Sequence, residues 1–211
     1  MKILVAGANG AIGQILVDKL IERGYEVAGM VRKESQQDAL RKAGAEAVLA
    51  DLTDKESLAK AVEQRDAVVF VAGSKGKALE SVDRDGAIHL CDTAKNADVP
   101  RFILLSSIFA GRPEQGPENL QPYLKAKLAA DVHMQKSGLD YTILRPGALK
   151  DTAETGAIRI DDSFEDTDAE ISRADVAEVI AASLSEPKTI GAVFEFIAGD
   201  TPIDEALARL G

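Results

Sequence analysis

The first 24 residues combine an apolar run, a glycine-rich turn and an amphipathic segment. Residues 3–6 form an unbroken apolar run, which is typical of a parallel strand covered on both faces. Apolar residues then recur at helical spacing up to about Arg23, and Gly24 ends the predicted helix. The turn between them contains Gly7, Gly10 and Gly13. A strand, a glycine turn and a helix in this order predict a dinucleotide-binding unit.

Each glycine of this turn has a separate predicted role. Gly7 allows the tight turn after the strand, Gly10 lets the backbone approach a pyrophosphate, and Gly13 lets the helix lie close to the sheet. Backbone N–H groups and the helix N-terminus then bind the phosphates. The predicted phosphate-binding residues are Gly7, Asn9, Gly10, Ala11, Ile12 and Gly13. A glycine turn without a ligand is the alternative, and the strand-turn-helix context favours the nucleotide site.

The glycines have the spacing Gly-x-x-Gly-x-x-Gly. In this pattern the sequence resembles the short-chain dehydrogenase/reductase superfamily, and more closely its atypical and extended NAD(P)-binding branches, with NmrA-like and epimerase/dehydratase-like relatives. The resemblance extends over nearly the whole chain. It implies an α/β fold of the Rossmann type and a nicotinamide dinucleotide as cofactor.

Length and charge limit the classes to which the chain can belong. A chain of 211 residues with 45% hydrophobic residues suits one well-buried domain, residues 1–211. The net charge of −10 disfavours nucleic acid and membrane surfaces, so we expect a small-molecule substrate and a monomer or homodimer. Residues 1–20 are taken up by a strand and a helix, so we expect no signal peptide, no membrane span and a cytoplasmic location. The single cysteine, Cys91, excludes an internal disulfide, and no Cys/His spacing indicates a metal.

Strand and helix patterns alternate along the rest of the chain. Predicted strands cover residues 26–31, 45–50, 67–72, 101–107, 140–144 and 193–197, with a short one at 157–160. Predicted helices cover 35–43, 55–63, 79–96 (or from 82), 122–138 and 203–210, and another begins at 171. Thr53 or Asp54 is the expected cap of helix 55–63, and Ser172 of the helix that begins nearby. Alternation without a hairpin predicts a doubly wound parallel sheet.

The tip of the second predicted strand indicates which cofactor is preferred. An acidic residue there accepts the ribose 2′-hydroxyl of NAD, whereas an arginine suits the 2′-phosphate of NADP. This tip carries Arg32 and Lys33, so we predict NADP(H) rather than NAD(H). A merely solvated strand-end cation is the alternative, and Glu34 lies close enough to leave NAD open.

Other strand ends supply further predicted cofactor contacts. The resemblance implies that Asp51 contacts the adenine amino group and that the backbone at Leu52 contacts its ring; a turn-capping Asp51 is the alternative. The carboxyl end of strand 67–72 is expected to line the nicotinamide ribose, with Ala72, Gly73 and Ser74. The segment 74–77 either closes over the phosphates or forms a solvated loop.

Two serines and a Tyr-x-x-x-Lys pair are the candidate reactive groups. Ser106 and Ser107 end the predicted strand 101–107, at the same sheet edge as the glycine turn. Tyr123 and Lys127 lie one turn apart on a predicted helix and so share a face. A phenol, with an ordinary pKa of about 10, is a poor proton carrier at neutral pH unless a cation favours the phenolate. Lys127 is the expected cation.

Together these groups predict hydride transfer at a carbonyl carbon. Ser107 stabilises the developing oxyanion, Tyr123 passes the proton, and Lys127 also holds the nicotinamide ribose. The superfamily uses such a set, so the resemblance implies Ser107, Tyr123 and Lys127 as catalytic residues, with Ser106 near the cofactor. A chance Tyr-x-x-x-Lys on an amphipathic helix is the alternative, and the position after the glycine turn favours catalysis.

The C-terminal third is short for a substrate-binding region. Residues 137–147, Ser-Gly-Leu-Asp-Tyr-Thr-Ile-Leu-Arg-Pro-Gly, resemble the atypical branch, which implies that Pro146 lies beside the nicotinamide carboxamide. Fewer than 70 residues follow Pro146, so the substrate region is small and comes mainly from 108–121 and 148–172. The acidic run 161–168 is either simply solvated or repels anionic substrates.

Two functions from different classes fit this sequence. The first is an NADP(H)-dependent oxidoreductase or an epimerase/dehydratase-like enzyme, which Tyr123 and Lys127 favour. The second is a non-catalytic NADP(H)-binding protein that senses redox state. The small substrate region favours the sensor, as does the lack of an assignable relay asparagine where Asp83, Arg84 and Asp85 stand.

Overall fold

The computed structural model describes residues 1–74, 76, 78–165 and 169–211. Lys75 and Lys77 of the predicted loop 74–77, and residues 166–168 of the acidic run, lie outside the described residues. The strands are β1 (Lys2–Ala6), β2 (Glu26–Val31), β3 (Glu46–Leu49), β4 (Ala67–Phe70), β5 (Arg101–Leu105), β6 (Asp140–Pro146), β7 (Ala148–Lys150), β8 (Ala157–Asp161), β9 (Glu170–Ser172), β10 (Val193–Ala198) and β11 (Thr201–Pro202). The helices are α1 (Ala11–Glu22), α2 (Gln37–Ala43), α3 (Lys55–Val62), α4 (Asp85–Asn96), α5 (Gln121–Gln135), α6 (Arg173–Ser183) and α7 (Ile203–Ala208).

The strands of the described residues form a nine-stranded sheet in the order β11-β8-β10-β6-β5-β4-β1-β2-β3, and β7 pairs with β9 separately. The strands from β3 to β10 in this order are parallel, whereas β8 and β11 are antiparallel to their neighbours. The chain order reverses at β1, which has β2 on one side and β4 on the other. This confirms the predicted α/β fold of the Rossmann type, in which ligands bind at the carboxyl ends beside the reversal.

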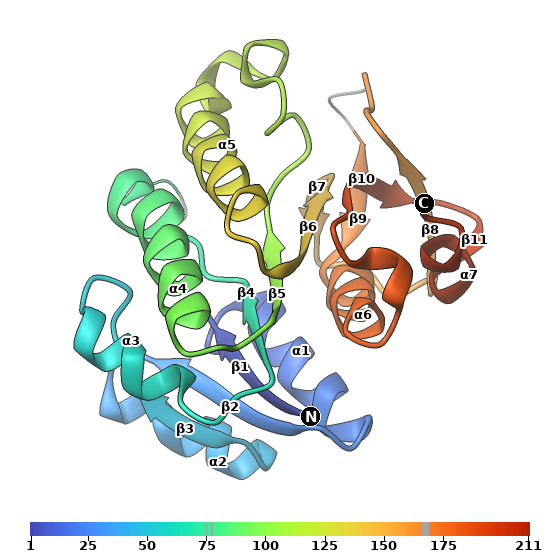
Figure 1. Cartoon of the computed structure of the whole chain (residues 1–211). Helices are drawn as coiled ribbons and strands as arrows, with labels where there is room; N and C mark the ends of the chain where they lie inside the picture. The colour runs from blue at the N-terminus through green and yellow to red at the C-terminus, as the bar shows by residue number, and fades with distance from the viewer. Residues whose placement is uncertain (75, 77, 166–168) are drawn as a thin grey trace.

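Both faces of the sheet are covered, as the apolar run of β1 predicts. Ile3 and Val5 belong to a core cluster that includes residues of α1 and α6, and Leu4 and Ala6 belong to a second one with residues of α3, α4 and α5. Figure 1 shows α3, α4 and α5 in a row along one side of the sheet. Alternate side chains of one strand therefore pack against two helical layers.

Two predicted helix caps are confirmed. Asp54 Oδ1 accepts a hydrogen bond from Glu56 N at 3.1 Å at the start of α3. Ser172 Oγ accepts one from Asp175 N at 2.9 Å at the start of α6. Each side chain satisfies an N–H group that the first helical turn leaves without a partner.

The buried face of α5 differs from the predicted one. Apolar periodicity placed Leu124, Leu128 and Val132 toward the sheet, but Val132 is exposed and Leu128 only half-buried. Lys127 and Asp131 are buried instead, on the face that also carries Leu124. Both charged side chains have polar partners at the end of β5, which explains how the interior tolerates them.

Several boundaries also differ from the predicted ones, and two of the differences concern candidate site residues. Strand β5 ends at Leu105, so Ser106 and Ser107 follow the strand rather than belong to it. The predicted helix 79–96 begins as a π-helical turn, Leu79–Arg84, before α4. Asp83 lies in this turn and is buried. Such turns are frequent at functional sites.

A buried arginine joins several elements at the opposite end of β5. Arg101 Nη2 donates hydrogen bonds to Thr142 Oγ1 and Ser183 O, both at 2.7 Å, and to Thr189 Oγ1 at 3.0 Å. Its Nη1 donates to Asp140 O at 2.7 Å. Burial lowers the pKa of Arg101 to about 10, against a smaller raising effect of Asp140. The guanidinium thus stays charged at neutral pH, and neutral oxygens satisfy it.

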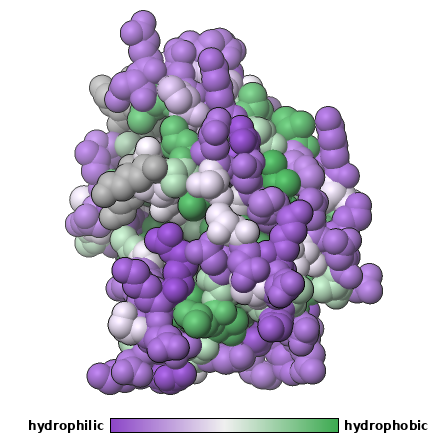
Figure 2. All heavy atoms as spheres, turned by 90° about the vertical axis from the view of Figure 1, so that its left-hand side faces the viewer, coloured by the Kyte–Doolittle hydropathy of each residue, from purple (hydrophilic) through white to green (hydrophobic). Residues whose placement is uncertain are grey.

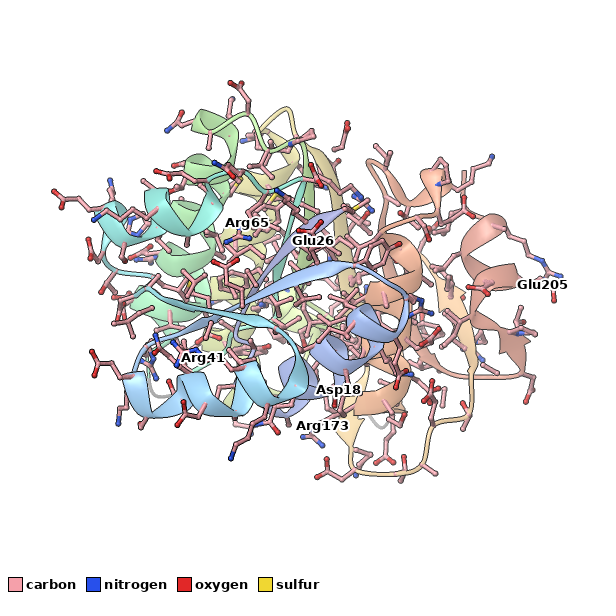
Figure 3. The ribbon with its side chains drawn as sticks, turned by 90° about the horizontal axis from the view of Figure 1, so that it is seen from below. Asp18, Glu26, Arg41, Arg65, Arg173 and Glu205 are labelled. Atoms are coloured by element: carbon pink, nitrogen blue, oxygen red, sulfur yellow. The ribbon has the colours of Figure 1, made fainter. Side chains whose placement is uncertain are left out.

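We expect Arg101→Met to lower the free energy of unfolding by about 2–3 kcal/mol, because the substitution leaves buried oxygens without their charged donor. Arg41→Met is the matched control. Arg41, labelled in Figure 3, is more than half exposed on α2, so its loss should change stability by less than about 0.5 kcal/mol. Urea unfolding of the two variants measures both values, and equal stabilities would contradict a structural role of Arg101.

The face viewed in Figure 2 is mainly hydrophilic, and apolar residues appear on it in small separate groups. The large apolar side chains that are exposed among the described residues are Met1, Leu49, Leu120, Val132 and Ile190. Within the described part of the chain, no helix has both the length and the hydropathy needed to cross a bilayer.

Candidate functional site

The three glycines of the first turn differ in what their surroundings require. Gly7 has φ +96°, and a Cβ there would lie 2.6 Å from Ala72 N. A Cβ on Gly13 would lie 2.1 Å from Gly7 O. The predicted roles of Gly7 in the turn and of Gly13 in helix packing are therefore confirmed, because no larger residue fits either position.

Gly10 is different because little in the fold itself requires a glycine there. Its φ of −79° and ψ of 167° suit any residue, and its Cβ would meet only Gly7 O, at 3.2 Å. Gly10 is the N-cap residue of α1, and because glycine has no side chain, no side-chain hydrogen bond occupies the first N–H groups of the helix. A larger residue would fill the open space in front of these groups, which is where a phosphate fits.

The neighbouring residues of this turn are arranged consistently with the prediction. Asn9, Gly10 and Ala11 are exposed, whereas Ile12 is buried in the core. Asn9 O accepts a hydrogen bond from Gln14 Nε2 at 3.2 Å, which ties the turn to α1. The exposed backbone of the turn is thus fixed by the buried side chain of Ile12 and by this hydrogen bond.

Arg32 and Asp51 lie near each other at the tips of adjacent strands. Val31 pairs with Leu49, and Ala50 N donates to Val31 O at 3.0 Å. Arg32 is exposed, and among the described residues no carboxylate pairs with its guanidinium within 4.0 Å. Its backbone N–H and that of Lys33 donate to Gln36 Oε1, at 3.2 and 3.1 Å, which fixes the turn after β2.

Asp51 caps its own turn, which is the alternative considered for it. Its Oδ1 accepts hydrogen bonds from Thr53 N at 2.9 Å and Thr53 Oγ1 at 2.7 Å. These bonds, and more weakly the charge of Arg32, lower the pKa of Asp51. Leu52 is buried. The carboxylate is therefore ionised, and the predicted adenine contact depends on its other oxygen.

The end of β4 is held by a buried carboxylate. Asp83 accepts hydrogen bonds from Ser74 N, at 3.3 Å to both oxygens, and from Ser74 Oγ. A Cβ on Gly73 would lie 3.4 Å from Asp83 Oδ1. Ala72 is half-buried against the core. The predicted nicotinamide-side residues thus follow β4, but the Ser74 hydroxyl is bound to Asp83.

Tyr123, Lys127 and Ser107 come together at the carboxyl end of β5. Burial raises the pKa of Tyr123 well above its ordinary value, Asp83 adds to this effect, and a hydrogen bond with Ser107 opposes it. Lys127 Nζ donates to Leu105 O at 2.5 Å. Lys127 is not among the groups that shift the pKa of Tyr123, so the expectation that it favours the phenolate stays a prediction. The lysine is held by a backbone carbonyl, and Tyr123 is a neutral phenol.

A buried cluster beneath these residues was missed in the sequence analysis. Ser106 Oγ donates to Asp131 Oδ2 at 2.9 Å, and Arg145 Nε donates to the same oxygen at 3.0 Å. The signal that could have revealed Asp131 is spacing, because Tyr123, Lys127 and Asp131 recur every four residues on α5. The contacts of Ser106 with Arg145 through Asp131 depend on tertiary structure alone.

A second buried acid, Glu195 on β10, organises the predicted substrate region. Its Oε1 accepts from Phe109 N at 3.1 Å, its Oε2 accepts from Phe164 N at 2.8 Å, and Arg112 donates to both oxygens at 3.0 Å. Phe109 has φ +64°, a conformation that costs energy in a non-glycine residue. Pro146 is buried at the end of β6, and its carbonyl accepts from Ile108 N at 2.9 Å.

One group of possible metal ligands occurs among the described residues, although the sequence spacing predicted none. Cys91, Asp92 and His133 each place a ligand atom within 4.8 Å of the others. His133 Nε2 lies 2.6 Å from Asp92 Oδ1, a hydrogen-bond distance. Burial raises the pKa of Cys91 to about 11, so the sulfur is a thiol and not the thiolate that metals bind.

A family model described as NAD(P)H-binding matches residues 7–187. The chain belongs to this NAD(P)H-binding family of atypical short-chain dehydrogenases/reductases. The chain is 43% identical over 216 residues to the uncharacterized sugar epimerase YhfK of Bacillus subtilis (strain 168), with 100% of both chains covered. A solved structure of a putative NAD-dependent epimerase/dehydratase from Bacillus halodurans matches with a TM-score of 0.93 and 39% identity over 100% of both chains. ChuY, an anaerobillin reductase from Escherichia coli O157:H7, has a TM-score of 0.85 and 25% identity over 95% of this chain and 98% of its own.

Membership of the NAD(P)H-binding family confirms the resemblance drawn from the glycine spacing. The family match begins at Gly7 and extends through Tyr123, Lys127 and Pro146. It concerns the cofactor class, NAD(P)H. The residues at the strand tips, Arg32 above all, bear on the choice between NADP and NAD.

Proposed function

We propose that this protein is an NADP(H)-dependent oxidoreductase that reduces a carbonyl group of a small molecule. The observation that carries the proposal is the placement of Tyr123 and Lys127 one turn apart on α5, with Lys127 bonded to the last residue of β5 just before Ser107, at the same sheet edge as the Gly10 turn. Relatives named as an epimerase/dehydratase and as a reductase support the same class of chemistry.

The site fits a nicotinamide dinucleotide. The open space in front of Gly10 suits the pyrophosphate, and the exposed guanidinium of Arg32 suits a 2′-phosphate. Lys127 has used one of its three donors on Leu105 O, so two remain for ribose hydroxyls. A bound nicotinamide supplies the hydride.

The remaining chemistry belongs to the side chains of this chain. Ser107 donates a hydrogen bond to the carbonyl oxygen and stabilises the charge that develops on it. Tyr123 donates the proton that completes the alcohol. Burial keeps Tyr123 in its phenol form in the protein without cofactor, and this is the form that carries the proton to be donated.

A panel of aldehydes, ketones, quinones and nucleotide-sugars, assayed for NADPH oxidation, tests the proposal. We expect at least one class to be reduced. Tight NADPH binding without turnover of any class would contradict the enzyme and support the redox-sensing alternative. Interconversion of a nucleotide-sugar without net NADPH consumption would instead favour the epimerase form of the site.

The choice of cofactor makes a separate prediction. Arg32→Asp should weaken NADPH binding by about 10–100-fold, because a charge-assisted contact is replaced by repulsion, and should leave NADH as the better ligand. Lys42→Asp makes the same change of charge at an exposed position of α2 and should preserve the preference for NADPH. Calorimetric titration of both nucleotides gives the affinities. Equal binding of NADPH and NADH by the unaltered protein would remove Arg32 from the 2′-phosphate site.

A further inference from the structure

A buried carboxylate lies one helical turn beyond Lys127 on α5. Asp131 is fully buried, and its Oδ2 atom receives Ser106 Oγ at 2.9 Å, Arg145 Nε at 3.0 Å and Arg145 Nη2 at 2.9 Å. Its other oxygen, Oδ1, is buried and has no hydrogen-bond partner among the described residues. Burial raises the pKa of Asp131, whereas the charge of Arg145, the hydrogen bond from Ser106 and the charge of Lys127 oppose this effect and favour the carboxylate. A buried carboxylate oxygen is seldom left without a positive or donating group nearby.

Lys127 is the nearby cation on the same face of α5 without a carboxylate bonded to it. Its amine is fully buried, bonds to Leu105 O and lies 6.0 Å from the centroid of the Phe70 ring. A carbonyl dipole and a ring replace only part of the hydration that an ammonium loses. Burial lowers the pKa of Lys127, and the charge of Asp131, then that of Asp83, opposes this effect.

The other charged or titratable groups around Lys127 are already engaged. Asp83, from the π-helical turn, has both oxygens on Ser74. Tyr123, from α5, is a neutral phenol. Arg145, from β6, is bonded to Asp131 and repels another cation. Among the described residues, Asp131 Oδ1 is therefore the negatively charged oxygen near Lys127 that no hydrogen bond already occupies.

We propose that Asp131 is a positioning residue that keeps the buried Lys127 amine in its ammonium form and links it to Ser106 and Arg145. In this arrangement one oxygen fixes the end of β5 and the start of the loop after it, and the other faces the lysine charge. The contact of the ammonium with a ribose rests on the proposed function. The effect of Asp131 on the protonation of Lys127 is independent of that function.

A titration of Lys127 by NMR tests this directly, without substrate or cofactor. The whole chain carries lysine labelled with ¹³C at Cε, and Lys127→Met identifies the resonance. We expect Lys127 to remain an ammonium through neutral pH in the unaltered protein, and to lose its proton at lower pH in Asp131→Asn. Asp204→Asn, an equal change of charge at an exposed position of α7, should leave the titration unchanged.

Binding of NADP⁺ provides the second readout. Relative to the unaltered protein, Asp131→Asn should lose about tenfold more affinity at pH 9 than at pH 6, because only the ammonium makes charge-assisted contacts. An unchanged Lys127 titration in a folded Asp131→Asn would overturn the inference, and so would loss of the proton below neutral pH in the unaltered protein. If Asp131→Asn does not fold, the titration of Lys127 in the unaltered protein tests the inference by itself. Absence of NADP⁺ binding would refute the proposed function and leave the NMR result standing.

Discussion

Tyr123→Phe is expected to lower the rate of carbonyl reduction by about 10²–10⁴-fold, the range that a positioned proton donor contributes. The ring keeps its packing against the cluster that contains Leu124 and Phe164, since only the hydroxyl is removed. Affinity for NADPH should change by less than about twofold, because the lost group acts on the substrate and not on the nucleotide. Stopped-flow measurement of NADPH oxidation, with calorimetry for binding, separates the two quantities.

Tyr141→Phe is the matched control for this prediction. Tyr141 pairs with Phe102 in the sheet and is half-buried in the core, on β6. Removal of its hydroxyl should leave the rate within a factor of about two, since it takes no part in the proposed site. If Tyr123→Phe reduced a substrate as fast as Tyr141→Phe does, another group would have to supply the proton.

Gly10→Val should weaken NADPH binding by about 100-fold or more while the protein stays folded. The backbone at Gly10 already has a conformation that valine adopts, and the added Cβ meets only Gly7 O, at 3.2 Å. The branched side chain would instead occupy the space in front of the α1 N-terminus, where the pyrophosphate must lie. Calorimetry and thermal unfolding of the same sample measure affinity and fold together.

Gly13→Ala supplies the contrast. A single methyl group there lies 2.1 Å from a backbone oxygen, so the variant should lose stability before any effect on binding is reached. We therefore expect Gly10→Val to be stable but unable to bind NADPH, and Gly13→Ala to be unstable. Normal NADPH affinity in folded Gly10→Val would show that the first turn is not the phosphate site.

Much of the fold could be predicted because its signals are local. The apolar run before Gly7, the regular alternation of strand and helix patterns, and caps such as Asp54 and Ser172 each depend on a few neighbouring residues. Gly7 and Gly13 were assigned their roles for the same reason: turn geometry and close packing have simple sequence patterns.

The candidate site was less predictable because its contacts join distant parts of the chain. Periodicity placed Leu128 and Val132 inward, yet α5 buries Lys127 and Asp131, whose partners lie at the end of β5, just after it and on β6. No local pattern shows that Lys127 meets a backbone carbonyl and leaves Tyr123 a neutral phenol. That outcome depends on burial, which the sequence of one helix does not specify.

The hydrogen bonds of Glu195 make two separate segments of the chain one mechanical unit. Residues near 109 and near 164 are both attached to a side chain of β10, which lies outside either segment. Both segments share one carboxylate, so a substitution that displaces either segment disturbs the side chain that holds the other. Evolution of a new specificity would have to alter these segments in concert, and a graft of either one from a relative should work only if Arg112 and Glu195 are transferred as a pair.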